Sequence, residues 1–140
     1  MTTMRTLVAA LTASALSCTH WAKLVTVPID SADASVLVDD AFEFLSSELP
    51  PATSVIVFPR DSDTEPLNGG LRRTCVRSGY ALGPAYGPNA ARRVWASFRR
   101  AGGGYLLELD LTGVAMTRWY MRTRAGKLVA AGPRMVRRAS

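Results

Sequence analysis

The sequence has very few of the residues that most metal sites and nucleophilic active sites require. Among 140 residues it has one histidine, His20, and two cysteines, Cys18 and Cys75. A structural zinc site takes about four Cys or His ligands, and a Ser or Cys nucleophile usually needs a histidine as its base. We therefore predict no catalytic site, no metal site and no cofactor.

Two other features have plain structural interpretations. The carboxylates of Asp39, Asp40 and Glu43 are typical of a solvated helix face. The glycines Gly102 to Gly104 lack the Lys and Ser/Thr of a phosphate-binding loop and indicate a hairpin turn. Neither feature changes the expectation that the protein is not an enzyme.

Long hydrophobic runs are also missing. The longest lies near the N-terminus and has about a dozen residues, whereas a membrane-spanning helix needs about 20. A positive start in residues 1–5, an apolar stretch in residues 6–16 and small residues after it form the pattern of an export signal. We predict that residues 1–17 are a signal peptide; the alternative is a buried N-terminal helix.

The end of this segment has two possible cleavage sites. Ala13-Ser14-Ala15 is a small-x-small site for a general signal peptidase. Residues 15–18 (ALSC) resemble a bacterial lipobox, although Ala15 and Leu16 differ from its usual Leu and small residue. In the second case Cys18 becomes the lipidated first residue of the mature protein, and residues 18–30 become a tether.

A disulfide between the two cysteines is the competing interpretation of Cys18. Cys75 follows Leu67 and Leu71 at four-residue intervals, which places it on the inner face of a helix. A free buried cysteine is a common core residue. The spacing therefore favours an unpaired, buried Cys75.

Positive charge is scarce in the first half of the chain, and negative charge is scarce in the second. Residues 1–65 have three basic and nine acidic residues, and residues 66–140 have 14 basic and two acidic residues. Fifteen of the 17 basic residues are arginine, which is consistent with phosphate recognition or with an Arg-rich coding bias. The division also predicts that the acidic first helix contacts the basic C-terminal region of a neighbouring copy.

Hydrophobic periodicity predicts one domain over residues 31–133, followed by a basic tail over residues 134–140. Two segments have helical spacing, and the rest of the domain alternates as strands do. The predicted fold is α+β, with two helices packed on a mainly antiparallel sheet that ends in a β-meander. The predicted helices are residues 32–48 and 67–78, and the predicted strands are residues 53–58, 80–82, 92–99, 105–111, 114–123 and 128–131.

The stretch Arg118-Trp119-Tyr120 is the strongest candidate for a partner interface. In a strand, Arg118 and Tyr120 share one face and Trp119 points to the other. Trp, Tyr and Arg are the residues most favoured as interface anchors, and Arg122 and Arg124 follow directly. The alternative is an ordinary cross-strand pair on a half-buried sheet.

Several stretches together resemble the TrbH family of conjugal transfer proteins. They are residues 31–51 (SADASVLVDDAFEFLSSELPP), 71–82 (LRRTCVRSGYAL), 109–120 (LDLTGVAMTRWY) and 128–133 (LVAAGP). The resemblance implies a lipoprotein subunit of the mating-pair-formation apparatus, a type IV secretion system that moves plasmid DNA between bacteria. In this sequence the residue that matches the lipidated cysteine is Cys18, and the resemblance brings no catalytic motif.

We therefore expect a non-enzymatic structural lipoprotein, anchored in the outer membrane on its periplasmic side. Its expected partners are other subunits of a conjugative transfer complex, with no direct contact to nucleic acid, and oligomerisation within the assembly is left open. The alternative is a small basic domain in the cytoplasm, either nucleic-acid-binding or regulatory, with residues 1–17 as part of its fold. Salt-dependent binding of DNA would support this alternative over the lipoprotein.

Overall fold

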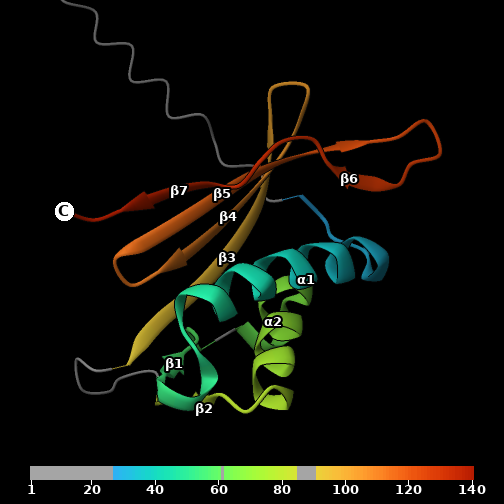
Figure 1. Ribbon diagram of the computed structural model, residues 1–140. Coiled ribbons are helices and arrows are strands. Elements are labelled where there is room, and N and C mark those ends of the chain that lie inside the picture. The colour runs from blue at the N-terminus through green and yellow to red at the C-terminus, as the bar shows by residue number, and fades with distance from the viewer. Residues whose placement is uncertain (1–26, 61, 85–90) are drawn as a thin grey trace, which may run out of the picture.

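Two helices cover one face of a seven-stranded, mostly antiparallel sheet (Figure 1). The computed structural model of the chain describes residues 27–60, 62–84 and 91–140. The predicted signal peptide, Cys18 and the first part of the predicted tether lie outside these residues. The α+β class with its closing meander is confirmed. No helix in the described part of the chain is long and apolar enough to cross a membrane.

Helix α1 (Ser31–Glu48) begins and ends where the sequence indicates. The Asp30 carboxylate accepts a hydrogen bond of 2.7 Å from the Asp33 amide, which satisfies a free N–H group of the first turn. Prolines 50 and 51 end the helix and begin the short 3₁₀ turn η1 (Pro51–Thr53). The apolar stripe is fully buried against the sheet and α2, as predicted, and includes Leu37, Ala41, Phe44 and Leu45.

The first strands form a small parallel section that the sequence pattern did not reveal. Strand β1 (Val55–Val57) pairs in parallel with both β2 (Ala81–Leu82) and β3 (Arg92–Ala101). A second 3₁₀ turn, η2 (Ser62–Thr64), and α2 (Pro66–Arg77) connect β1 to β2. Parallel neighbours need such a crossover, so this section is a β-α-β unit at one side of the sheet.

Helix α2 ends in a glycine cap, as the sequence predicts. Gly79 has a φ of +88°, the left-handed conformation that glycine adopts without a Cβ clash. The amide of Gly79 donates to the carbonyl of Val76, and the amide of Tyr80 donates to that of Cys75. This is the Schellman arrangement, and it turns the chain so that Tyr80 is buried beside the fully buried Cys75.

The long strands form an antiparallel meander in the order β3, β4 (Gly104–Leu111) and β5 (Val114–Arg122). Alternate side chains face the helices and make the core. The cross-strand row of Ala96, Leu109 and Met116 illustrates this, because all three residues are fully buried. The other face of the meander is not covered by a helix in the described part of the chain (Figure 1).

The C-terminal residues differ from the prediction. We expected residues 134–140 to be a basic tail, but β7 (Met135–Arg138) pairs with the first half of β5. The short β6 (Leu128–Ala130) pairs with the second half of β5. All four residues of β7 are exposed, so hydrophobicity did not mark the strand.

Candidate functional site

The predicted interface residues on β5 divide between the two faces of the sheet. Tyr120 is 1% exposed and faces the helices, and Arg118 lies on the same face. Trp119 points away from the helices and is 38% exposed. The predicted alternation is therefore confirmed, and of these three side chains Trp119 is the one on the open face.

Asp40 of α1 holds the inward-facing polar groups together. Its carboxylate accepts a hydrogen bond from the Tyr120 hydroxyl and forms an ion pair of 2.7 Å with Arg118. Arg134, just before β7, binds the same carboxylate and also pairs with Glu43 at 2.5 Å. The prediction that Asp40 lies on a solvated face was wrong, because the inner face of β5 supplies a donor and a cation at this position.

Burial and hydrogen bonding act in opposite directions on the Asp40 carboxyl. Burial raises its pKa, but the hydrogen bonds from Tyr120, Arg134 and Arg118 outweigh burial and hold the pKa below its usual range. For Tyr120, burial and then the bond to Asp40 both raise the pKa of the hydroxyl. At neutral pH the network therefore contains an ionised Asp40 and a protonated Tyr120.

A second group of contacts links α1 to the far end of β5. Arg122 forms an ion pair of 2.5 Å with Asp33 and donates a hydrogen bond of 2.9 Å to the carbonyl of Gly126. The Arg122 guanidinium also lies over the Tyr105 ring, 5.4 Å from its centroid, and Arg100 lies over the same ring at 5.9 Å. Arg122 therefore connects the first turn of α1, the β5–β6 turn and the start of β4.

The charges of the two halves meet within one chain. We expected the acidic helix to contact the basic region of a neighbouring copy, but the structure pairs these charges internally. Arg122, predicted as an interface residue, is engaged in this way, whereas Arg124 in the β5–β6 turn is exposed and makes no ion pair among the described residues. The internal ion pairs are Asp33–Arg122, Asp40–Arg118, Asp40–Arg134, Glu43–Arg134 and Glu48–Arg138.

The open face of the sheet has a line of large apolar side chains around Trp119. Leu106 is opposite Trp119 on β4 and is 8% exposed, so its neighbours largely cover it. Met121 lies two residues along β5 on the same face and is 52% exposed. Trp95 of β3 is on this face too, but the polar row of Ser97, Glu108 and Thr117 separates it from Leu106 and Trp119. We call Leu106, Trp119 and Met121 the open-face apolar group. Aromatic residues and Met are enriched in protein–protein interfaces.

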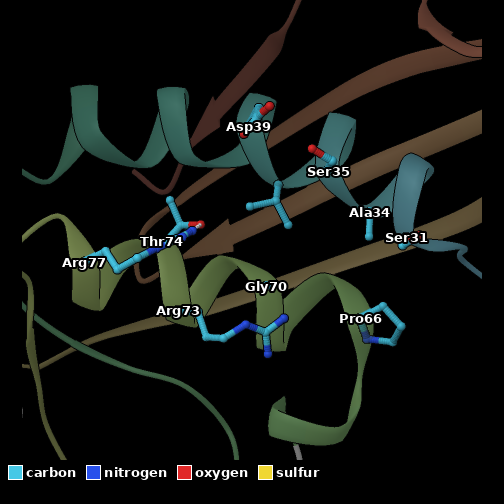
Figure 2. Close-up of a pocket in the computed structure, with 10 residues that line it drawn as sticks. Ser31, Ala34, Ser35, Asp39, Pro66, Gly70, Arg73, Thr74 and Arg77 are labelled. Atoms are coloured by element: carbon cyan, nitrogen blue, oxygen red, sulfur yellow. Dashed lines mark hydrogen bonds between the residues drawn. The ribbon is translucent and has the colours of Figure 1, made fainter.

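A shallow groove of about 310 Å³ lies between α1 and α2 (Figure 2). The helices are in close contact at Gly70 in its lining, where an added Cβ would lie 2.9 Å from Val38. Its lining mixes the cations Arg73 and Arg77 with the carboxylate of Asp39, so it has no single charge preference. The groove brings together no acid–base pair that indicates catalysis.

The structure describes Cys75 but not Cys18 or His20. Cys75 is unpaired and fully buried, as predicted, and burial raises the pKa of its thiol to about 12. Such a thiol is not a reactive nucleophile at neutral pH. Among the described residues, no three His, Cys, Asp or Glu side chains are grouped as metal ligands. Cys18 and His20 lie outside the described residues.

Asn68 was not identified from the sequence. Its amide is fully buried and makes two hydrogen bonds of 2.8 Å to Ala96 of β3, donating to the carbonyl and accepting from the N–H. β1 pairs with β3 only around Arg92 and Arg93, so Asn68 takes the place of a neighbouring strand further along. An asparagine at the start of a helix can have many roles, and no sequence signal indicates that Asn68 bonds to the backbone of β3.

The comparisons with known proteins give one match. A family model described as "Conjugal transfer protein TrbH" matches residues 18–139. The comparisons with curated proteins and with solved structures found no match.

Proposed function

Because the chain belongs to the TrbH family of conjugal transfer proteins, we propose that it is a non-enzymatic lipoprotein subunit of a conjugative type IV secretion apparatus. Its anchor is lipid on Cys18, and it is held at the outer membrane on the periplasmic side. The observation that carries the proposal is the family match, which extends from Cys18 to residue 139. The export pattern of residues 1–17 supports it.

Lipid on Cys18 would attach the protein to a membrane without a membrane-spanning helix. Each buried methylene of an acyl chain contributes about 0.8 kcal/mol to membrane affinity, so several chains on one cysteine hold a protein firmly. The packed domain then remains in the aqueous space next to the membrane. Its role in the apparatus is to bind other subunits.

The Cys18→Ser variant tests the anchor in a cell. In a strain that lacks this protein, we expect the variant to restore plasmid transfer at least about a hundredfold less well than the natural chain, since several chains are worth far more than 2.7 kcal/mol. We also expect the variant to fractionate away from the outer membrane. Cys75→Ala is the matched control, because it removes the other cysteine and should leave localisation unchanged. Normal membrane localisation of Cys18→Ser would contradict the proposal.

We propose that the open-face apolar group contacts an apolar surface of another subunit of the apparatus. Of the predicted interface residues Arg118, Trp119, Tyr120, Arg122 and Arg124, the structure leaves Trp119 and Arg124 available, since the other three make internal contacts. Exposed tryptophans at the centre of an interface are frequent hot spots.

Trp119→Ala should reduce transfer without unfolding the domain. We expect the transfer frequency to fall at least about tenfold, because the loss of a hot-spot contact of about 2 kcal/mol weakens binding about thirtyfold. Urea unfolding checks that the variant remains folded, because the Trp119 side chain is more covered than exposed and its removal costs some stability. Val76→Ala is the control, since Val76 is an exposed apolar residue of α2 on the opposite layer. Equal effects of the two variants would remove the argument for this face.

A further inference from the structure

We propose that the end of the domain at which the predicted tether enters is a membrane-facing surface that binds the anionic headgroups of a phospholipid bilayer. We call Arg99, Arg100, Arg124 and Lys127 the tether-end basic surface. The inference rests on the lipid anchor proposed above and adds a second, electrostatic attachment. None of these four residues makes an ion pair among the described residues, although Arg100 also lies over the Tyr105 ring.

The contacts of Arg122 bring this surface to the start of α1. Arg122 joins Asp33 in the first turn of α1 to Gly126 in the β5–β6 turn. Arg100 and Arg122 lie over one Tyr105 ring, so the end of β3 is in the same place. Residues 27–30, the described end of the predicted tether, lead directly into the first turn of α1 (Figure 1).

The positive charge of this surface is not neutralised by the domain. Arg100, Arg124 and Lys127 are exposed, Arg99 is half-buried, and none of the four makes an ion pair among the described residues. Asp33 is committed to Arg122, which leaves the capping residue Asp30 as an exposed carboxylate at this end.

Glu108 is the acid of the meander nearest to this surface. It shares the open face with Arg99, whose partner Leu106 is two residues away on β4, about 7 Å at 3.4 Å per residue. Arg100 pairs with Tyr105, from which Glu108 and Asp110 are three and five residues along β4, about 10 and 17 Å. These longer separations exceed the screening length of about 8 Å at physiological salt, so Glu108 balances at most one of the four cations. The surface therefore presents a net positive field outward.

The length of the tether identifies a bilayer as the partner. With lipid on Cys18, residues 18–30 separate the membrane from α1 by at most about 45 Å, and by about 20 Å for a flexible chain. The tether-end basic surface is thus kept close to the headgroups. A basic side chain near an anionic surface contributes about a fivefold gain in binding. A polybasic patch beside an acyl anchor is a recognised second signal for stable attachment.

The test measures how much anionic lipid increases binding of the full chain, with Cys18→Ser so that no acyl chain is present. Co-sedimentation is compared between vesicles of phosphatidylcholine and vesicles that also contain 30% phosphatidylglycerol, a proportion of about one lipid in three chosen for a strong surface potential. One variant combines Arg100→Gln, Arg124→Gln and Lys127→Gln. The matched control combines Arg73→Gln, Arg93→Gln and Arg137→Gln, which removes the same charge from exposed residues elsewhere. Urea unfolding checks that both variants fold.

We expect phosphatidylglycerol to increase vesicle binding by the chain that keeps all its basic side chains. The tether-end variant should reduce this increase at least about tenfold, and the control variant should change it less than about threefold. High salt should abolish the increase. Equal losses in both variants, or no preference for phosphatidylglycerol, would overturn the proposal. Release from the vesicles by duplex DNA at equal phosphate concentration would also overturn it, in favour of a nucleic-acid surface. Because no acyl chain is present, the result is independent of whether Cys18 is lipidated.

Discussion

Asp40 is the residue that most tightly connects α1 to the sheet. It is 8% exposed and binds two arginines and the hydroxyl of the fully buried Tyr120. Removing one member of such a group leaves the others without a partner, which costs more than the group contributes as a whole. Asp40 is therefore a structural residue, although its neighbours Asp39 and Glu43 are the solvent-exposed carboxylates that the sequence suggests.

Asp40→Asn should destabilise the domain by about 2–3 kcal/mol at neutral pH. The substitution removes the charge that balances Arg118 and Arg134 and weakens the acceptor of the Tyr120 hydroxyl. Urea unfolding measures the change. Asp39→Asn is the control, and we expect it to change stability by less than about 0.5 kcal/mol because Asp39 is exposed.

The difference between natural Asp40 and Asp40→Asn should also depend on pH in a fixed direction. The pKa of Asp40 is lowered in the folded protein, so its contribution is complete above the ordinary carboxyl pKa of about 4 and is lost as pH falls through the folded value. We expect the two unfolding curves to approach each other below about pH 4. A difference that grows on acidification would contradict this role.

At the scale of elements, the features that local residue patterns determine, such as helix ends, were predicted from the sequence. The amphipathic stripe, the Asp30 cap and the prolines after α1 define that helix, and Gly79 defines the end of α2. The parallel pairing and β7 were missed for physical reasons. β1 and β2 were predicted as strands, but a local pattern does not show which strands pair. β7 is held by pairing with β5 and by Arg138 binding Glu48, contacts between residues far apart in sequence.

Asn68→Ala tests how α2 is held to β3. The change leaves the N–H and carbonyl of Ala96 buried without these partners, and we expect a loss of about 2–3 kcal/mol in the free energy of unfolding. Urea denaturation measures it, with Thr74→Ala as a control of similar size on the less buried part of α2. A loss below about 0.5 kcal/mol would show that Asn68 does not connect these elements.

At the scale of the whole molecule, the structure changes the meaning of the charge division. Four acids of α1 pair with arginines of β5 and the C-terminal segment inside one chain; they are Asp33, Asp40, Glu43 and Glu48. Arg99, Arg100, Arg124 and Lys127 make no ion pair among the described residues, and as the tether-end basic surface they contribute positive charge to the exterior. The signs of the two halves were predictable from the sequence, whereas the ion pairs were not, because they depend on which residues the fold brings together.

The candidate site was predictable only in part. The alternation of β5 placed Trp119 on the face opposite Tyr120, and the structure agrees. The internal engagement of Arg118 and Arg122 was not predictable, because their partners lie on α1, 78 and 89 residues away in sequence. Hydrophobic patterns identify faces, whereas ion pairs between distant elements require the fold.

The central claim is that the protein is a lipoprotein anchored through Cys18, and the intact mass of the membrane-extracted protein tests it most directly. We predict a chain that begins at Cys18 and carries the added mass of its acyl groups. A chain that begins at Leu16 without lipid, or one that retains Met1, would contradict the account.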